Sequence, residues 1–203
     1  ILGNGENYVA EISFATNEGD VSGNCYVGGY AGRANGTEMR TLINNSTISG
    51  KSYVGGIAGY AGKCISCQNN GDISNQGYSI TSDNQAISYI GGIAGYLTGA
   101  ENCTNNSNIN ASTGGDYVGG IAGYLLADRS VDNEIKGNKN HGTIDGTAYV
   151  GGIFGYLGIA GSPNNSDTIT VKSNINDGDV TGSEDYVGGI IGYAVGESHN
   201  VRQ

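Results

Sequence analysis

The chain has no tryptophan, a single proline and two phenylalanines among its 203 residues. Aromatic side chains supply much of the packing in a conventional core, so their scarcity argues against a large one. Glycine, in contrast, accounts for 38 residues and lacks the strict one-in-three period of collagen. The composition therefore favours many short strands separated by glycine turns, while the regular isoleucine, valine and tyrosine argue against disorder.

Basic residues are also few: 9 lysines and arginines stand against 19 acidic residues, for a net charge of −10. This balance argues against a nucleic-acid partner and against an anionic membrane surface, because both require positive charge. No apolar run is long enough to cross a bilayer, so we expect no membrane insertion by this segment. No signal peptide is visible either, and because the chain starts within a repeat we expect a mature product or an excised piece.

A tyrosine–glycine motif recurs six times along the chain. Its fullest form is YVGGIAGY, and the first copy departs from it by reading YVGGYAGR and ending in Arg33. The copies begin at Tyr26, Tyr53, Tyr89, Tyr117, Tyr149 and Tyr186. The first and last copies lie 160 residues apart over five steps, a mean period of 32 residues. A regular period of this length is the signature of a repeat architecture.

A second block, built around a β-branched anchor, precedes each copy. The anchors are Val21, Ile48, Ile73, Ile109, Ile144 and Val180. Four residues before each anchor stands an asparagine: Asn17, Asn44, Asn69, Asn105, Asn140 and Asn176. Nine residues before each anchor the side chain is apolar in nearly every copy: Ile12, Met39, Cys64, Ala100, Ile135 and Val171. These matches at fixed offsets extend the repeat over the whole unit.

One such unit cannot bury its own apolar face, so successive units must stack. We therefore predict an all-β fold: a right-handed parallel β-solenoid of about six rungs that occupies residues 1–203 as a single segment. The handedness follows from the usual preference of parallel crossovers. Stacking places like residues in columns, where the asparagines are expected to form a hydrogen-bonded ladder and to tolerate left-handed backbone. The Gly-Gly pair suits a corner that has no room for a Cβ atom.

The asparagine block NxGxIxG followed by YVGGIxGY resembles the GLUG-motif repeats, and the resemblance covers nearly the whole chain. That family occurs in large bacterial surface and secreted proteins, including the non-catalytic regions of immunoglobulin A1-specific metallopeptidases. The resemblance implies an extracellular location, at the cell surface or secreted, and a solenoid architecture. It carries no chemistry to any residue of this chain.

The residues of catalysis and metal binding are sparse. A zinc peptidase needs a motif such as HExxH, whereas His141 and His199 lie far apart and neither is followed by glutamate. Acidic residues share one column just before the anchor: Asp20, Asp72 and Asp179. They follow the repeat instead of interrupting it, so we interpret them as solvated turn acids and predict that the chain is not an enzyme. No cofactor is expected; the weak possibility of calcium rests on residues 177–179 and 128–134.

Cys67 and Cys103 occupy one column of adjacent rungs, at a separation that permits a disulfide. Two interpretations remain: an inter-rung bridge, or stacked buried thiols that behave as small apolar side chains. We favour the thiols.

The tyrosines form two predicted columns, one from the first residue and one from the last residue of the motif. The candidate binding residues are the last ones: Tyr60, Tyr96, Tyr124, Tyr156 and Tyr193. A column of exposed rings can stack on sugars or anchor a protein partner. The alternative, which we favour, is that the rings pack over glycines at corners and shield the core.

Three functions are compatible with these features. The chain is a stalk or adhesion module, or an accessory substrate-recognition region of a secreted peptidase or glycan-degrading enzyme; a solenoid enzyme acting on carbohydrate is the third and weakest. Host glycans and surface proteins are the possible partners. We also expect the segment to stack on flanking repeats of a parent chain.

Overall fold

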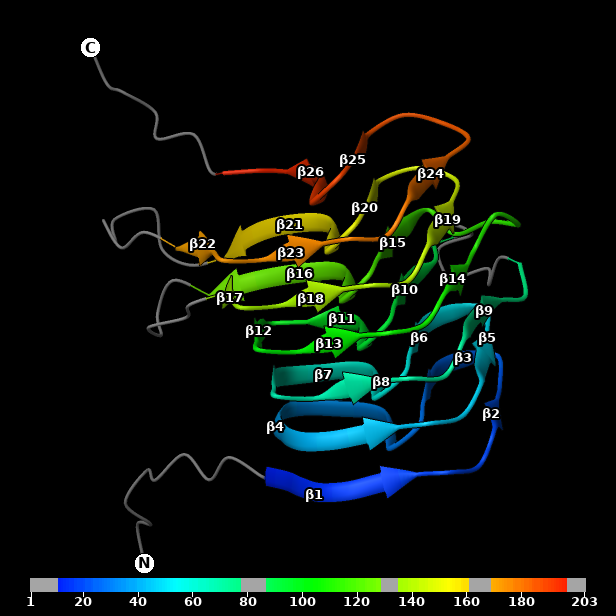
Figure 1. Cartoon of the computed structure of the whole chain (residues 1–203), viewed down its shortest axis with the longest axis vertical. Helices are drawn as coiled ribbons and strands as arrows, with labels where there is room; N and C mark the ends of the chain where they lie inside the picture. The colour runs from blue at the N-terminus through cyan, green and yellow to red at the C-terminus, as the bar shows by residue number, and fades with distance from the viewer. Residues whose placement is uncertain (1–10, 78–86, 129–134, 161–168, 197–203) are drawn as a thin grey trace, which may run out of the picture.

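The computed structural model describes residues 11–77, 87–128, 135–160 and 169–196. Across these ranges the chain consists of short strands and turns, and every strand pairing is parallel. None of the described residues belongs to a helix that is long and apolar enough to span a bilayer. The strands are stacked in successive turns of the chain, from the N-terminus at one end to the C-terminus at the other (Figure 1).

Each turn, or rung, contributes to three sheets, and residues at equivalent positions of successive rungs form a column. The anchors form a six-stranded sheet in the order β2-β5-β9-β14-β19-β24. Its strands are β2 (Val21–Ser22), β5 (Ile48–Gly50), β9 (Ile73–Asn75), β14 (Ile109–Asn110), β19 (Ile144–Gly146) and β24 (Val180–Gly182).

The beginning of each tyrosine motif forms the second six-stranded sheet. Its strands are β3 (Cys25–Gly28), β6 (Ser52–Gly55), β10 (Tyr89–Gly91), β15 (Tyr117–Gly119), β20 (Val150–Gly151) and β25 (Val187–Gly188). Two sheets with six strands each confirm a solenoid of six rungs.

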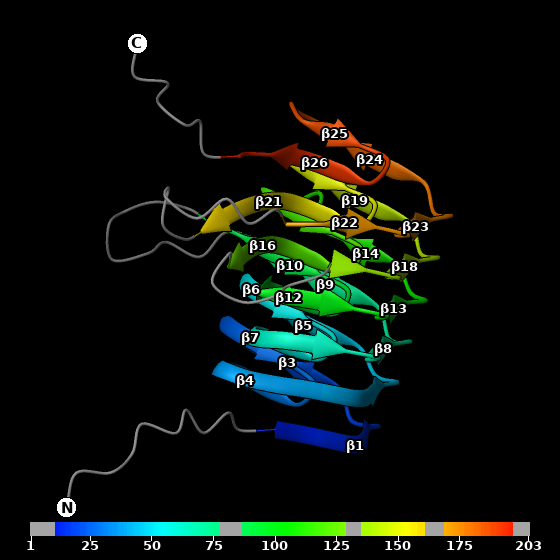
Figure 2. The same ribbon diagram turned by 90° about the vertical axis from the view of Figure 1, so that its left-hand side faces the viewer.

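The third sheet has 14 strands, because the chain bends within it and returns. Its outgoing leg comprises β4 (Ala31–Asn44, which also rounds the bend), β7 (Ala58–Ile65), β11 (Ala94–Leu97), β16 (Ala122–Asp128), β21 (Phe154–Ala160) and β26 (Ile191–Ala194). Its returning leg comprises β1 (Glu11–Asn17), β8 (Gln68–Asn69), β13 (Thr104–Asn105), β18 (Lys139–Asn140) and β23 (Ile175–Asn176), with β12 (Gly99–Glu101), β17 (Ile135–Lys136) and β22 (Val171–Lys172) at the bend. Figure 2 shows both legs, with β16 and β21 on the left and β13 and β18 on the right.

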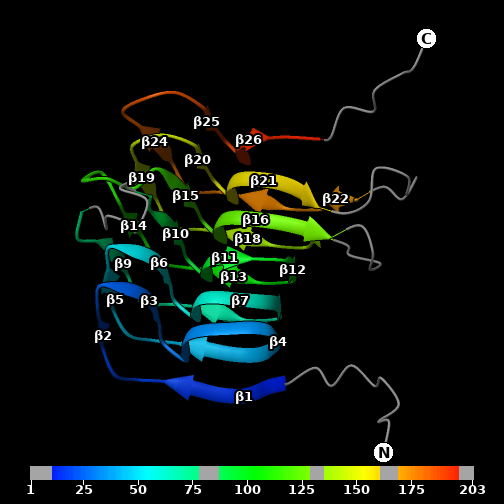
Figure 3. The ribbon, with the colours of Figure 1, turned by 180° about the vertical axis from the view of Figure 1, so that it is seen from behind.

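The coil is right-handed, as predicted. In Figure 1 the returning leg runs to the right on the near side, and the chain then passes behind and comes back to the left while it rises toward the C-terminus. Figure 3 shows the same path from behind. Register confirms the repeat alignment, because like residues face each other: Ile73 pairs with Ile109, and Asn69 pairs with Asn105.

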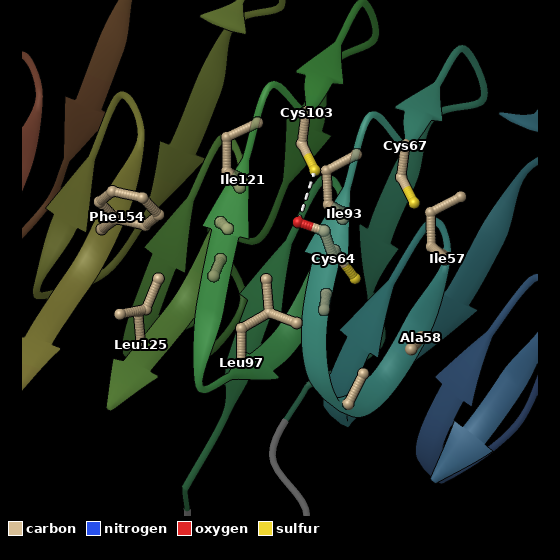
Figure 4. Packing of buried hydrophobic residues seen from close by; sticks show 14 of the residues in the cluster. Ile57, Ala58, Cys64, Cys67, Ile93, Leu97, Cys103, Ile121, Leu125 and Phe154 are labelled. Atoms are coloured by element: carbon tan, nitrogen blue, oxygen red, sulfur yellow. Dashed lines mark hydrogen bonds between the residues drawn. The ribbon is translucent and has the colours of Figure 1, made fainter. Parts of the chain in front are cut away.

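The core consists of two apolar clusters that run the length of the stack. One lies between the two six-stranded sheets and contains the anchors, with Ile48, Ile73 and Ile109 at most 1% exposed. The other fills the bend of the large sheet and contains alanine, cysteine and isoleucine columns (Figure 4). Small and medium-sized apolar side chains make up most of both clusters, in keeping with the absence of tryptophan. Two long insertions, between Ile73 and Tyr89 and between Tyr156 and Val171, are expected from the spacing to be surface loops. Residues 78–86 and 161–168 of these insertions lie outside the described residues.

Candidate functional site

The predicted asparagine ladder is present and unbroken over the six rungs. Each side-chain Nδ2 donates to Oδ1 of the asparagine in the next rung, at 2.7–2.8 Å. The donors and acceptors run through Asn17, Asn44, Asn69, Asn105, Asn140 and Asn176. The same nitrogen also donates to the carbonyl two residues later, as from Asn105 to Ser107 O at 2.7 Å. Both amide hydrogens are therefore used at every internal rung, which buried amides require.

The second glycine of each Gly-Gly pair lies directly against this ladder. A Cβ atom at Gly56 would overlap Oδ1 of Asn69, and one at Gly92 would overlap the side chain of Asn105. The glycines are therefore required for close approach, as expected of the corner. The asparagine block and the tyrosine motif, separate in the sequence, form one packed unit.

The left-handed backbone expected at the ladder asparagines is not found there, so that prediction was wrong. It occurs three residues earlier in every rung, at Phe14, Thr41, Ser66, Asn102, Gly137 and Ser173, with φ between 53° and 67°. It also occurs at four tyrosines that open the motif, Tyr26, Tyr53, Tyr149 and Tyr186, with φ between 48° and 64°. A ladder asparagine ends a strand and needs extended backbone to aim its amide along the axis. The sharp bend falls in the exposed turn before it, where sequence reasoning found no shared residue type.

The candidate tyrosines of the motif's last position form one continuous stack, which we name the second tyrosine column. Neighbouring ring centroids lie 4.4–5.4 Å apart, with angles between ring planes of 4–25°. The stack contains Tyr60, Tyr96, Tyr124, Tyr156 and Tyr193. Because near-parallel rings at this distance cover one another's faces, the middle of this column offers mainly ring edges and hydroxyl groups. The geometry therefore leaves little room for a sugar to stack between them.

The first tyrosines of the motif form a parallel column beside it, which we name the first tyrosine column. It contains Tyr26, Tyr53, Tyr89, Tyr117, Tyr149 and Tyr186, with neighbouring centroids 4.5–5.1 Å apart. Its rings meet the second column edge to face, as between Tyr89 and Tyr124 at 5.3 Å and 76°. Together the two columns make an aromatic strip along one side of the solenoid, which we name the tyrosine ribbon.

The ribbon is half buried and half open to solvent. Tyr96 and Tyr124 are intermediate in exposure, and Tyr186 in the last rung is 48% exposed. Burial, followed by the neighbouring phenols, raises the pKa of Tyr124 to about 12 and raises that of Tyr89 further. The half-buried rings thus present a neutral hydroxyl-bearing surface.

Arg33 explains the departure of the first motif copy. Its guanidinium lies 5.2 Å from the ring centroid of Tyr26 and 5.3 Å from that of Tyr60. It therefore takes the place of a ring at the N-terminal end of the second tyrosine column, through cation–π contacts.

Two of the three acidic residues near the anchors accept a hydrogen bond from the next rung. Asp20 Oδ1 accepts from the backbone nitrogen of Thr47 at 2.9 Å, and Asp72 Oδ1 accepts from that of Asn108 at 3.2 Å. Such carboxylates link each turn to the next rung, and Asp179 in the final rung is exposed. The column follows the repeat, as interpreted from the sequence.

A second polar column, which sequence reasoning missed, lies one residue after the ladder on the exposed side. It contains Glu18, Asn45, Asn70, Asn106, His141 and Asp177. Asn106 Nδ2 donates to Asn70 Oδ1 at 2.7 Å, and His141 Nδ1 lies 2.9 Å from Asp177 Oδ2. The repeated Asn-Asn pairs were the signal that pointed to it. We name this the outer polar column.

The calcium hypothesis gains no support from the arrangement of oxygen ligands. Within the described part of the chain, no three His, Cys, Asp or Glu residues gather to hold a metal ion. Asp177 is engaged by His141, and residues 129–134 of the other candidate lie outside the described ranges.

The cysteines are free thiols, and those at positions 64, 67 and 103 are buried. Cys103 Sγ donates to the carbonyl of Cys64 at 3.3 Å, as Figure 4 shows, and burial raises the pKa of the Cys103 thiol. Asn138 takes the same place one rung later and donates to Ala100 O at 3.0 Å. The thiols therefore act as hydrogen-bond donors to the preceding rung.

Comparisons with protein-family models, with curated proteins and with solved structures found no match.

Proposed function

We propose that the chain is a non-catalytic, rigid spacer in a bacterial cell-surface or secreted protein, serving as a stalk or adhesion segment. The unbroken asparagine ladder is the observation that supports this function. Five consecutive side-chain bonds couple six rungs, so bending between rungs would break one of them, and the three internal bonds are buried. A segment with this construction keeps a fixed distance between whatever is attached to it.

Rigidity can be measured directly with two spin labels. Ser22 and Thr181 are exposed, stand in one column and are separated by five rung steps. Cysteine at both positions, in a Cys25→Ser background, should give a single narrow distance distribution near about 24 Å, from the inter-strand spacing. A broad distribution would contradict a spacer. The Asn105→Ala variant serves as a comparison, since it should broaden the distribution.

A recognition role is the second candidate, and the tyrosine ribbon supports it. Tyrosine offers apolar area and a hydrogen-bonding group with few rotatable bonds, which is typical of binding surfaces. This candidate corresponds to the accessory substrate-recognition region, with host glycans or surface proteins as partners.

The ribbon is tested by binding to glycan arrays, mucin and immunoglobulin. Tyr96, Tyr124 and Tyr156 are changed together to phenylalanine in one variant and to alanine in another. Because the ribbon presents hydroxyls and ring edges, binding that needs the hydroxyls should be lost in the folded phenylalanine variant, and binding through the ring edges should be lost only in the alanine variant. Saturable binding that survives in both variants would exclude the ribbon as the site. If the unmodified chain binds none of these partners, the spacer role is the one that remains.

The extracellular location is a prediction from the resemblance to GLUG-motif repeats. Antibody labelling of intact cells that express the parent protein tests it, with permeabilised cells as the control. Labelling only after permeabilisation would contradict it.

A further inference from the structure

The side chains of this protein that a one-electron oxidant can both reach and oxidise are gathered in the tyrosine ribbon. Tryptophan is absent, and the single methionine, Met39, is 0% exposed. The thiols of Cys64, Cys67 and Cys103 are buried, and oxidation of a thiol requires access to it. The rings of the two tyrosine columns, in contrast, all keep part of their surface open to solvent. An oxidant therefore meets a continuous row of phenols.

The second tyrosine column alternates short and long steps. The ring centroids of Tyr60 and Tyr96 lie 4.4 Å apart, with 4° between the ring planes. Those of Tyr124 and Tyr156 lie 4.5 Å apart at 9°. The steps from Tyr96 to Tyr124 and from Tyr156 to Tyr193 are longer, at 5.3 Å and 5.4 Å. The column therefore contains two close pairs, Tyr60–Tyr96 and Tyr124–Tyr156.

The backbone holds each close pair in register. Tyr60 and Tyr96 are direct partners in the parallel pairing of β7 with β11. Tyr124 and Tyr156 are direct partners in that of β16 with β21. Within each pair the two hydroxyl groups lie close enough to interact. Because the rings are also nearly parallel, the ortho carbons beside the two hydroxyls face each other, and these are the carbons through which phenoxyl radicals join.

We propose that the tyrosine ribbon is a site of oxidative cross-linking, where a haem peroxidase with hydrogen peroxide joins each close pair as dityrosine. Each phenol gives up one electron and its hydroxyl proton, and the two radicals form a bond between their ortho carbons. Each of these carbons then loses its hydrogen as a proton, and each oxygen regains a proton, which restores both hydroxyls. The peroxide takes up the two electrons and the two remaining protons, its O–O bond breaks, and two water molecules form.

A cross-link of this kind would join two successive rungs covalently. In the unfolded chain it closes a loop of one repeat and so lowers the conformational entropy of that state. The oxidised solenoid should therefore unfold at a higher temperature than the untreated one. This inference depends neither on the spacer role nor on the recognition role proposed above.

Cross-linking is tested on the Cys25→Ser chain, which lacks the exposed thiol, with a haem peroxidase and hydrogen peroxide at several protein concentrations. The monomer, isolated by size exclusion, should show dityrosine fluorescence in a yield that does not depend on protein concentration. Mass spectrometry of its peptides should find Tyr60–Tyr96 and Tyr124–Tyr156 in excess over Tyr96–Tyr124. The same treatment in urea, where the column is absent, should lose this preference.

Two phenylalanine variants serve as controls for each other. Phenylalanine keeps a ring in the column but has no hydroxyl and forms no phenoxyl radical. Tyr60→Phe should lose the Tyr60–Tyr96 product and keep Tyr124–Tyr156, whereas Tyr156→Phe should do the reverse. Circular dichroism establishes that each variant is folded, and thermal unfolding of the oxidised monomer measures the effect of the cross-links on stability.

Four results would overturn the proposal. A treated monomer without dityrosine would mean that the stacked rings do not couple. Dityrosine found only between chains would mean that tyrosines react by collision of separate molecules. The same distribution of pairs in urea and in buffer would mean that the stack does not direct the reaction. A cross-linked monomer that unfolds at the same or a lower temperature would exclude a stabilising role for the modification.

Discussion

Asn69 donates its side-chain amide to Oδ1 of Asn105 at 2.8 Å, and both residues are fully buried. They are 36 residues apart in the sequence and one rung apart in space. The repeat places equivalent asparagines in adjacent rungs, and side-chain hydrogen bonds of this kind join them into one continuous column inside the solenoid.

Asn105→Ala should destabilise the chain by about 1–3 kcal/mol, because it leaves one amide hydrogen of Asn69 and the side-chain Oδ1 of Asn140 buried without a hydrogen bond. Urea unfolding measures the difference. Asn106→Ala is the matched control, since its side chain bonds in the exposed outer polar column and should contribute less than about 0.5 kcal/mol. Equal midpoints for the two variants would contradict the ladder's role.

Gly92→Ala should cost about 3 kcal/mol, because the added methyl group would overlap Asn105 and the carbonyl of Gly120. Thermal unfolding provides the readout. Gly19→Ala is the control, since a methyl group there meets nothing within 4 Å. If both glycines tolerate alanine equally, the packing of ladder against motif is not what requires glycine.

Thr41→Gly should stabilise the chain by about 0.5–1 kcal/mol. Thr41 is β-branched and has φ of 54°, a strain that glycine lacks and that exceeds the backbone entropy that glycine loses. Gly137 already occupies this column at φ of 67°. Thr181→Gly, in an ordinary exposed strand position, should lower the midpoint instead; a loss of stability in both variants would argue against strain at Thr41.

The tyrosine ribbon should make the fold sensitive to alkali. The folded pKa of Tyr124, about 12, exceeds the unfolded value of about 10, so its neutral form favours folding. This contribution is complete below pH 10 and is lost as the pH rises from there through about 12. Near-ultraviolet absorbance and circular dichroism should report ionisation together with unfolding in that window. Tyr124→Phe, which cannot ionise, should unfold at higher pH, and an unchanged midpoint would contradict the coupling.

Much of the architecture was predictable because the period itself specifies the stacking. Once rungs of similar length lie one above another, the positions of Asn17 to Asn176 must fall into one column, and parallel pairing gives every amide the same neighbour. The solenoid, its six rungs and the ladder follow from this. The repeated Asn-Asn pairs in the sequence also indicated the outer polar column, although we did not interpret them that way.

The sequence by itself determined which residues share a column and that the asparagine column forms a ladder; the tertiary structure alone decided how the tyrosine columns pack and where the backbone bends. Strand alternation did not give the tilt of the tyrosine rings, which depends on packing between two columns separated by a corner. One set of left-handed bends falls at Phe14, Thr41 and Ser66, residues with no common chemistry, because the turn geometry and not the side chain imposes them. A second set falls at tyrosines that open the motif, such as Tyr26 and Tyr53.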